Sequence, residues 1–465
     1  MAKDYSKIKT RGFARNVAAS LAGLRAGGAM VIDQALQKAG IGREGEDSEF
    51  ARREARKFVE ELGKLKGSYV KIGQMLALFG EHFLPPVLTE ALHELEDKTR
   101  PLPWHVIEPA LRESLGKRFD ELDIETEALA AASMAQVHRA TVRASGEQLA
   151  LKIKYPGLDD VIDNDFDAVV RMLLLSRWLK AGRDLDRWLQ AMREQLHREA
   201  DYAREAQMTQ LMRANVEAWQ AEHPEAGVVF RAPKTHSEFS ADDVLALEYI
   251  EGLNVTNTCI ASLSQVERNA FGKAMLELFF LEVFAWDALQ SDPNFGNYLL
   301  TAKSRTKPAE LALLDFGSVI QLPLDQLDAL RQVIAAGLED EEAPLVEGLK
   351  KLGWLRDDAA ADAATSFASF CRQLLEPLQN PASLPAEYLN ASGDYHWANS
   401  RLIQRAGKSG ARKAASRHFA TPSRDFILIA RKLAGVFTFI AVLDAEFNGY
   451  DIAQKYIAHW RVNRR

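Results

Sequence analysis

The chain has 465 residues, of which 47% are hydrophobic and 26% charged, a composition typical of a globular protein with two or three domains. Its net charge of -7 argues against an extended nucleic-acid-binding surface, so no nucleic-acid partner is expected. Its two cysteines, Cys259 and Cys371, lie far apart without Cys or His at ligand spacing, which argues against a disulfide framework or a zinc site and fits a reducing compartment.

Residues 1–32 are basic, with Asp4 as their single acid, and apolar residues recur among them at helical spacing. This pattern is typical of a segment that lies on an anionic membrane or docks on a partner. The Arg-rich, acid-poor composition also resembles a transit peptide, and a solvated arm fits it equally well. We expect no secretory signal, because no compact apolar core is followed by a cleavage site.

Two apolar stretches further along are not expected to span a membrane. Residues 426–443 are interrupted by Arg431 and Lys432, which leaves an uninterrupted run that is too short. Residues 274–289 carry acidic side chains among apolar ones and predict a buried helix instead.

Helical periodicity predicts a helix over residues 50–83, which stops where Leu84 is followed by two prolines. Lys71 and Gln74 share one face of this helix. Gly73 lies between them, and because glycine costs about 1 kcal/mol against alanine inside a helix, its presence suggests close packing. The residues alone leave open whether Lys71 and Gln74 have a role or are ordinary surface side chains.

A rigid break at residues 100–103, where two prolines flank a leucine, is a plausible domain boundary. A helix over residues 86–98 is predicted before it and a helix over residues 104–116 after it. Further along, residues 187–216 are predicted to form one long charged helix.

An alanine-rich stretch precedes a predicted strand and consists of Ala130, Ala131, Ala132 and Ser133. A tight loop of small residues would let its backbone approach a ligand closely, as glycines do. A short alanine-rich helical turn fits the composition equally well, and no G-x-G-x-x-G is present.

Alternation over residues 149–155 predicts a strand with Ala150, Lys152 and Lys154 on one face. In kinases the corresponding Val-Ala-Ile-Lys strand places a small residue beside the adenine and a Lys on the α- and β-phosphates. Ala150 and Lys152 fit that register. Lys154 does not, and it is interpreted as a solvated or structural residue.

A kinase fold also needs a helical Glu that pairs with the strand Lys. Several acids in the charged helix, Glu199, Asp201 and Glu205 among them, meet this need, and periodicity does not choose between them. Two strands are predicted next, at residues 227–230 and 244–249, followed by a hinge at Glu251.

The segment 291–318 carries the strongest chemical signal. Asp292 and Asn297 have the Asp-x-x-x-x-Asn spacing that supplies a catalytic carboxylate and a metal-binding amide in kinases. Asp315, in an Asp-Phe-Gly that follows a short buried strand at residues 311–314, would hold magnesium against nucleotide phosphates. Each motif alone is weak, since a turn and a strand-end cap explain them as well. Their order and separation strengthen the pair.

The rest of the chain is predicted to be nearly all helix, with amphipathic segments at residues 324–352, 360–378 and 423–448. After Gly317 the chain passes through Pro323 directly into the first of these. No long activation segment and no Ala-Pro-Glu is left on which a peptide substrate could dock. Gln290 and Ser291 stand where many kinases have His-Arg.

Together these residues resemble the UbiB family of atypical kinases, also called aarF-domain kinases, over about residues 60–320. The matching elements, in chain order, are Lys71-Ile72-Gly73-Gln74, Ala130-Ala131-Ala132-Ser133, Ala150-Leu151-Lys152, Glu199-Ala200-Asp201, Glu205, Asp292 to Asn297, and Asp315-Phe316-Gly317. The helix with Arg431-Lys432-Leu433-Ala434-Gly435 also looks familial.

The resemblance implies an α+β fold, atypical and protein-kinase-like, with two lobes, an N-terminal helical extension and a mostly helical C-lobe. The expected parts are a basic arm and helical extension over residues 1–103, a kinase-like N-lobe over 104–250 and a C-lobe over 251–465.

The resemblance further implies roles for the catalytic and metal-binding positions. Lys152 would contact the α- and β-phosphates and pair with Glu205, and Asp292 would act as the base. Asn297 and Asp315 would hold Mg²⁺.

Other positions would surround the nucleotide or regulate the site. Lys71 and Gln74 would lie over the active site, with Lys71 near Glu199 and Asp201. The stretch Ala130 to Ser133 would replace the glycine-rich loop. The remaining nucleotide contacts are expected from Ala150, Glu248 and Ile250.

The implied function is that of an ATP- and Mg²⁺-dependent ATPase or small-molecule kinase that supports ubiquinone biosynthesis or related lipid metabolism at a membrane surface. Expected partners are ATP, an isoprenoid or phenolic lipid, an anionic membrane and proteins of quinone biosynthesis. The expected location is cytoplasmic or peripheral on an inner membrane, with the mitochondrial matrix as an alternative. A nucleotide-binding scaffold without phosphoryl transfer is the competing hypothesis, and protein-kinase activity is disfavoured.

Overall fold

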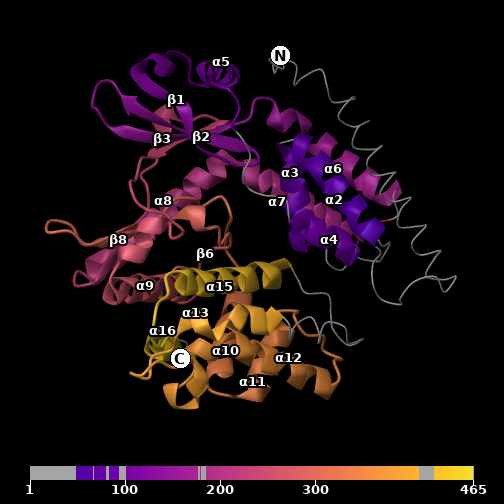
Figure 1. The fold of residues 1–465 in the computed structure, drawn as a ribbon, viewed down its shortest axis with the longest axis vertical. Helices are drawn as coiled ribbons and strands as arrows, with labels where there is room; N and C mark the ends of the chain where they lie inside the picture. The colour runs from indigo at the N-terminus through magenta and orange to yellow at the C-terminus, as the bar shows by residue number, and fades with distance from the viewer. Residues whose placement is uncertain are drawn as a thin grey trace. The chain divides into compact units, whose positions relative to one another are not determined.

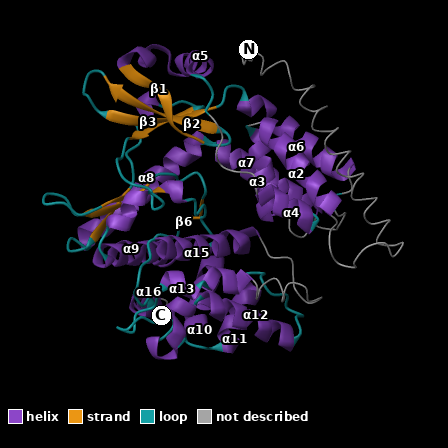
Figure 2. Ribbon diagram, in the orientation of Figure 1, coloured by secondary structure: helices purple, strands orange, loops and turns teal. Residues whose placement is uncertain are grey.

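The computed structural model describes residues 49–65, 67–79, 83–93, 101–175, 178–179, 185–407 and 424–463. The chain divides into two compact units, coloured by residue number in Figure 1 and by secondary structure in Figure 2. The first unit runs to Gln207 and includes Lys234–Tyr249, and the second combines Met208–Pro233 with Ile250–Arg465. The basic stretch at residues 1–32 lies outside the described residues. The finer division into three parts stays a prediction.

The first unit contains a four-stranded antiparallel sheet with the order β1-β2-β3-β5. Its strands are β1 (Leu122–Ala131), β2 (Ala135–Val142), β3 (Gln148–Lys154) and β5 (Val244–Glu248). Strand β3 alternates as predicted, with Leu149 and Leu151 buried and Ala150 and Lys152 partly exposed. Helix α5 (Trp104–Leu115) belongs to the same hydrophobic cluster as the buried residues of β3, so it covers that face (Figure 2).

Helices from two separate stretches of sequence share a second hydrophobic cluster in this unit. They are α2 (Glu49–Leu65), α3 (Ser68–Phe79), α4 (Pro86–His93), α6 (Leu158–Leu175) and α7 (Leu185–Ala200). The single helix predicted over residues 50–83 was wrong, because Gly67 adopts a positive φ of 63° and separates α2 from α3. The described helix α4 runs to His93, and residues 94–98 of the predicted helix 86–98 lie outside the described residues. No prediction covered α6.

The predicted long helix over residues 187–216 is two helices. Helix α7 ends at Ala200 and helix α8 (Tyr202–Glu222) begins two residues later, with Asp201 in the break. The carboxylate of Asp201 accepts a hydrogen bond from the backbone N–H of Arg204 at 2.9 Å. Asp favours this helix-capping arrangement over a helix interior, which explains why the charged pattern does not continue.

The second unit holds a three-stranded sheet of β4 (Val228–Arg231), β8 (Ala309–Leu313) and β7 (Tyr298–Thr301), in that order. A two-stranded ladder joins β6 (Leu289–Gln290) to β9 (Val319–Ile320). Helix α9 (Gln265–Phe284) is capped by Ser264 and Glu267, which satisfy each other's backbone N–H groups. The buried helix predicted over residues 274–289 therefore starts earlier and ends at Phe284, and Leu289 lies in a strand.

The remaining helices follow β9 and make this unit mostly helical. They are α10 (Leu324–Leu338), α11 (Glu342–Lys351), α12 (Ala361–Leu374), α13 (Trp397–Ser400), α15 (Arg424–Val442) and α16 (Tyr450–Asn463). Short 3-10 helices lie at Gly116–Glu121, Ser237–Phe239, Thr258–Ser262, Phe295–Asn297, Glu376–Leu378, Pro381–Ser383 and Ala386–Tyr388. The helix predicted over residues 324–352 is broken near Asp340, whose φ is 59°.

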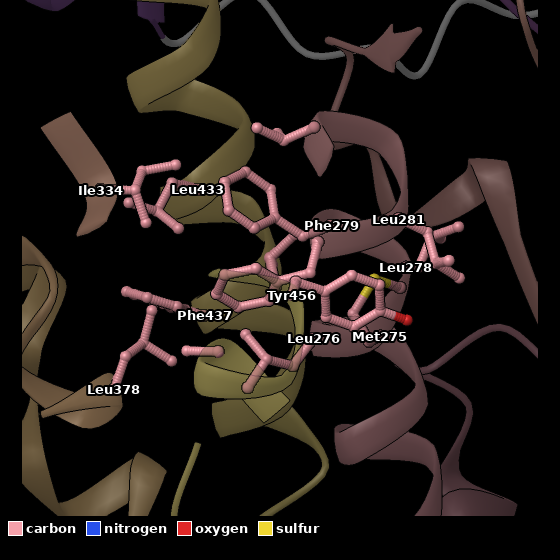
Figure 3. Packing of buried hydrophobic residues seen from close by; sticks show 14 of the residues in the cluster. Met275, Leu276, Leu278, Phe279, Leu281, Ile334, Leu378, Leu433, Phe437 and Tyr456 are labelled. Carbon is pink, nitrogen blue, oxygen red and sulfur yellow. The ribbon is translucent and has the colours of Figure 1, made fainter. Parts of the chain in front are cut away.

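The core of the second unit forms where α9, α15 and α16 meet (Figure 3). Figure 3 shows Phe279 of α9 among Leu433 and Phe437 of α15, with Tyr456 of α16 close by. The adjacent Phe280 stacks on Tyr456 with ring centroids 5.8 Å apart. None of the helices that the structure describes is long and apolar enough to cross a membrane.

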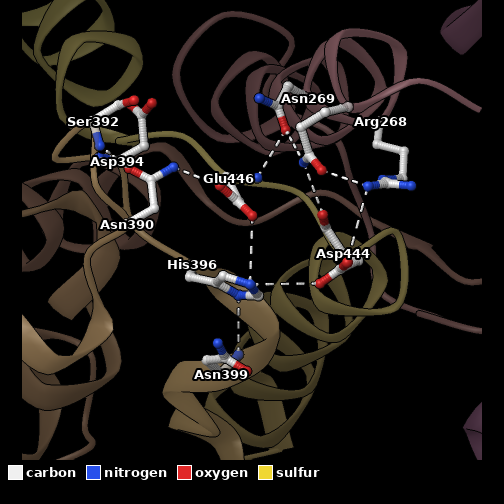
Figure 4. A network of polar contacts seen from close by, with 10 residues as sticks. Arg268, Asn269, Asn390, Ser392, Asp394, His396, Asn399, Asp444 and Glu446 are labelled. Atoms are coloured by element: carbon white, nitrogen blue, oxygen red, sulfur yellow. Dashed lines mark hydrogen bonds and ion pairs between the residues drawn. The ribbon is translucent and has the colours of Figure 1, made fainter.

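A polar network lies beside this core (Figure 4). His396 is 3.5 Å from a carboxylate oxygen of Glu446 and 3.8 Å from one of Asp444. The backbone N–H of Glu446 donates to the side chain of Asn269 on α9 at 2.8 Å. These contacts tie the turn after α15 to α9 and α13. The predicted α+β class is confirmed: the first unit combines a four-stranded sheet with helices, and the second is mostly helical.

Candidate nucleotide and metal site

Lys152 of β3 and Glu205 of α8 form an ion pair. The Nζ atom of Lys152 donates to both carboxylate oxygens of Glu205, at 2.6 and 2.9 Å. Glu205 is 2% exposed and Lys152 20%, so the carboxylate is buried and the ammonium is reachable from solvent. The structure thus selects Glu205 from the acids that the sequence left open. A buried carboxylate of this kind needs its cation, because an unpaired buried charge is costly.

Helix capping places Glu205. The backbone N–H of Glu205 donates to the carbonyl oxygen of Asp201 at 3.0 Å, and the Asp201 side chain caps the same turn. Glu205 therefore lies in the first turn of α8, where the helix dipole favours a negative charge.

The Lys-x-Gly-Gln segment lies on α3. Lys71 forms an ion pair with Glu199 of α7, and Gln74 lies half-buried one turn further along α3. Gly73 between them is buried. Lys71 and Glu199 are thus brought together as the resemblance implies, whereas the Asp201 carboxylate caps α8 through Arg204.

The alanine-rich stretch is a hairpin turn, and the helical-turn alternative was wrong. Ala130 and Ala131 end β1, and Ala132 donates its backbone N–H to the carbonyl of Ala135 at 2.8 Å. The hydroxyl of Tyr155 donates to the Ala132 carbonyl at 3.0 Å. Burial raises the pKa of Tyr155 to about 12, so this hydroxyl keeps its proton at neutral pH and holds the turn. Ser133 in the turn is buried.

Gln136 and His138 of β2 form a buried network that the sequence analysis missed. His138 Nδ1 donates to the Glu125 carbonyl at 2.7 Å, which leaves Nε2 to accept from the Gln136 amide at 2.7 Å. Gln136 also accepts from the backbone N–H of Leu102 at 2.8 Å, so the proline-rich break is tied to the strand that follows the alanine turn. Burial lowers the pKa of His138, which favours the neutral ring. Gln136 and His138 lie two residues apart on one face of the strand, and this spacing was the signal that could have indicated the buried network.

Lys154 has a structural role rather than a solvated position, the two interpretations that the sequence left open. It is 7% exposed, and its Nζ lies 3.0 Å from a carboxylate oxygen of Asp159. The same Nζ lies 5.2 Å from the centre of the Tyr202 ring. Lys152 alone of the two is paired with the buried Glu205.

The other expected nucleotide contacts lie along β3, β5 and the residues after β5. Ala150 is paired with Leu247 in the sheet. The carboxylate of Glu248 accepts a hydrogen bond from the backbone N–H of Lys234 at 3.1 Å, and Ile250, the first residue of the second unit after β5, is 5% exposed. Their contacts with a nucleotide stay a prediction.

In the second unit, Asn297 is hydrogen-bonded to Asp292. Its side-chain N–H donates to the Asp292 carboxylate at 3.2 Å and to the Asp292 carbonyl at 3.3 Å. Asn294 caps the short 3-10 helix between them by accepting from the Gly296 N–H. The loop is thus held by hydrogen bonds between its own residues, and the side chains of Asp292 and Asn297 are both half-exposed.

The Asp-Phe-Gly segment is held beside this loop. The N–H of Leu314 donates to the Asn297 carbonyl at 2.9 Å, which places Asp315 next to the loop. Gln290 donates to the Asp315 carbonyl at 3.2 Å, and the Ser291 hydroxyl donates to the Ser318 carbonyl at 2.7 Å. Gln290 and Ser291, which replace His-Arg, therefore join the two segments.

Four residues outside both motifs lie around the loop and were missed as site residues. Arg431 of α15 donates to the Asp292 carboxylate at 3.2 Å. Its neighbour Lys432, 0% exposed, lies 2.8 Å from a carboxylate oxygen of Glu282 and donates to the Tyr298 hydroxyl at 3.2 Å. Burial raises the pKa of Glu282 to about 7 against the opposing effect of Lys432. Burial also lowers the pKa of Lys432, but Glu282 and Tyr298 outweigh it and the net direction is upward.

Asn297 and Asp315 supply an amide and a carboxylate, the oxygen donors that Mg²⁺ prefers when it is shared with phosphates and water. Asn297 directly precedes β7 and Asp315 lies two residues after β8, next to the hydrogen bond between Leu314 and Asn297. No group of three or more His, Cys, Asp or Glu side chains that could hold a metal by itself occurs among the described residues. A metal at this donor set would therefore need ligands from elsewhere, as a nucleotide-bound Mg²⁺ has.

Known proteins resemble this chain over most of its length. A family model described as the ABC1 atypical kinase-like domain matches residues 94–348. The mitochondrial atypical kinase coq-8 of Caenorhabditis elegans is 26% identical over 395 residues, which are 84% of this chain and 49% of that protein. The mitochondrial atypical kinase COQ8B of Rattus norvegicus is 27% identical over 451 residues, 95% of this chain and 80% of that protein. The chain thus spans about half the length of the nematode relative.

A solved structure shares the fold. The Mycobacterium tuberculosis protein Rv3197, solved in complex with erythromycin, superimposes with a TM-score of 0.58 over 88% of this chain and 97% of the other, at 24% identity. At this level of identity the likeness concerns the fold alone.

Proposed function

The chain belongs to the ABC1 atypical kinase-like family, which includes the UbiB and aarF proteins, and on this premise we propose that it binds ATP with Mg²⁺ and cleaves the γ-phosphate. The observation that carries the proposal is the ion pair between Lys152 and Glu205. A buried Glu that holds a strand Lys is the arrangement that kinases use to keep the Lys on the α- and β-phosphates. A protein that only bound partners would have no need of it.

The proposed metal-binding and base residues belong to the second unit. Asn297 and Asp315 would hold Mg²⁺, which neutralises charge on the phosphates when it is bound. Asp292 would orient the attacking hydroxyl or water and accept its proton. Because Asn297 and Arg431 each hold one carboxylate oxygen, Asp292 keeps a fixed orientation for this step.

The acceptor is a small molecule or water rather than a protein. After Gly317, strand β9 returns to β6, and Pro323 directly precedes α10. No segment between them is long enough for a peptide platform of the protein-kinase kind. Lys71, Gln74 and the Glu199 partner of Lys71 would then regulate access to the nucleotide, and Asp201 would act with them.

We assign the activity to ubiquinone biosynthesis or related lipid metabolism, because curated relatives carry the names coq-8 and COQ8B. Those relatives are described as mitochondrial. A peripheral position on an inner membrane, an isoprenoid or phenolic lipid ligand and partner proteins of quinone biosynthesis belong to the same proposal.

The test is phosphate release from ATP and Mg²⁺ by the purified chain, with and without anionic liposomes and a phenol that resembles a quinone precursor. Asp315→Asn is the first variant, and Asp325→Asn, at the start of α10, is its matched control. We expect release that Asp315→Asn lowers at least 100-fold, together with loss of the Mg²⁺-dependent nucleotide shift in thermal denaturation. Release that is equal in both variants would contradict the assignment. Nucleotide-dependent stabilisation without any release would favour the scaffold hypothesis.

A further inference from the structure

The loop that carries Asp292 is held by one face of helix α15. Four residues of the helix contact it, at positions that follow helical spacing: Arg431, Lys432, Gly435 and Phe439. In many kinases an Arg directly before the catalytic Asp supplies a nearby cation from inside the loop. Here that position is Ser291, whose hydroxyl is bonded to the Ser318 carbonyl.

The first contact is electrostatic. Arg431 Nη2 donates to Oδ1 of Asp292 at 3.2 Å, and Asn297 Nδ2 donates to Oδ2 at 3.2 Å. Both carboxylate oxygens of Asp292 therefore accept a hydrogen bond, one from Asn297 in the same loop and one from Arg431 of α15. Side-chain exposures of 35% for Arg431 and 30% for Asp292 keep the pair reachable from solvent.

The second contact is steric. A Cβ placed on Gly435 would lie 2.0 Å from Cβ of Pro293, the residue after Asp292, which is far closer than two carbon atoms can approach. Glycine is thus required for α15 to approach the loop backbone this closely. One turn further, Phe439 meets the rings of Phe295 and Tyr298 edge-on, at 5.9 and 5.8 Å.

The third contact anchors the helix. Lys432, which is fully buried, bridges Glu282 of α9 and the hydroxyl of Tyr298, which directly follows Asn297. An ion pair removed from water tolerates little movement, because separation would leave a buried charge without a partner. The register of α15 against α9 and β7 is therefore fixed, and with it the position of Arg431.

We propose that α15 positions the candidate base and that Arg431 is a positioning residue, which orients the Asp292 carboxylate. This inference rests on the proposed function, because it assigns Asp292 the role of base. The contacts of α15 extend from Asp292 to Tyr298, the first residue of β7, so the helix sets the geometry of this loop. Helix α15 thus takes the part that an Arg within the loop plays in other kinases.

The experiment compares Arg431→Met and Arg431→Lys with Arg461→Met, a matched control that breaks the ion pair of Arg461 with Glu339. Hydrogen exchange followed by mass spectrometry measures the opening of residues 288–298 and does not require turnover. We expect Arg431→Met to exchange there about fivefold faster than the unchanged chain, and Arg461→Met to exchange at the original rate.

The split between kcat and KM for ATP gives the second readout. Loss of the Asp292 orientation should lower kcat about 10- to 100-fold in Arg431→Met. The KM for ATP should stay close to that of the unchanged chain, because Asp292 acts on the attacking group. Arg431→Lys should restore only part of kcat, since Lys supplies a cation but has no planar fork.

A second variant keeps the proposal testable through the steric contact. Gly435→Ala retains Arg431 but pushes on Pro293, so it should also speed exchange in residues 288–298 and lower kcat. Gly227→Ala, where a Cβ meets nothing within 4 Å, is its control. Exchange rates and kcat in Arg431→Met that match those of Arg461→Met would overturn the inference. If the unchanged chain hydrolyses no ATP, the proposed function fails while exchange still decides whether α15 holds the loop.

Discussion

At the scale of single residues, the buried ring of His138 in the first unit has a partner for each of its two nitrogens. His138 bonds to the Glu125 carbonyl through one nitrogen and to the Gln136 amide through the other. A charged ring would have to donate from both nitrogens, and the Gln136 amide nitrogen cannot accept. The network that links the proline-rich break to β2 therefore depends on a neutral His138.

This dependence predicts how stability changes with pH. Burial lowers the pKa of His138, so the folded protein binds this proton less readily than the unfolded chain, whose His has a pKa of about 6.5. The contribution to the free energy of unfolding is fully present above that pH and is lost as pH falls towards the folded value. Urea denaturation at pH 7.5 and at pH 5.5 should show a smaller loss in His138→Gln than in the unchanged chain.

The control for His138 is His197→Gln, whose ring is half-exposed beside Asp163. His197→Gln should lose as much free energy of unfolding between the two pH values as the unchanged chain does, because removing the His197 ring leaves the buried network of His138 intact. A His138→Gln variant with the same pH dependence as the unchanged chain would show that the buried ring takes no part in it.

At the scale of secondary-structure elements, the start of α8 decides where Glu205, the partner of Lys152, lies. Asp201 stops α7 and caps α8, and Glu205 follows in the first turn. The resemblance assigns Asp201 a regulatory role beside Lys71, and the structure adds a cap. These two roles make different predictions, because a cap needs an oxygen acceptor and a charge partner needs a carboxylate.

We expect Asp201→Ala to lower the free energy of unfolding by about 1 kcal/mol through the lost cap. It should also weaken ATP binding, since Glu205 is then held less firmly on Lys152. Asp201→Ser keeps an acceptor and should retain most of the stability and the affinity. Calorimetric titration with ATP and Mg²⁺ and urea denaturation measure both quantities. Equal losses in the two variants would favour the charge over the cap.

At the scale of the whole molecule, the apolar cores of the two units share none of the residues that the structure describes. The clusters of the first unit contain the sheet and helices α2 to α7, and the large cluster of the second contains α9, α15 and α16. Compact units with separate cores can unfold separately. The continuous α8 contributes residues to both units.

Unfolding in urea should therefore proceed in more than one step. Hydrogen exchange at increasing urea concentration is expected to release β3 and α9 at different midpoints, whereas α9 and α15, which pack in one core, should be released together. A single midpoint for all three elements would show that the two units unfold as one.

The sequence alone determined the fold class, most of the element types and the residues of the kinase-like motifs. Periodicity located β3 and α5, and the order of Lys152, Asp292, Asn297 and Asp315 indicated the chemistry before any contact was known. These features are readable because alternation, turn residues and motif spacing are local properties of the chain.

Only the tertiary structure decided which residues act together. It selected Glu205 among several acids, divided the predicted helices at Gly67 and Asp201, and brought Arg431 to Asp292 across 139 positions of sequence. A helix break that depends on the backbone angle or cap of one residue leaves only a weak signal in a periodic sequence pattern. A partner from a distant helix leaves no local pattern, because its contact is created by packing.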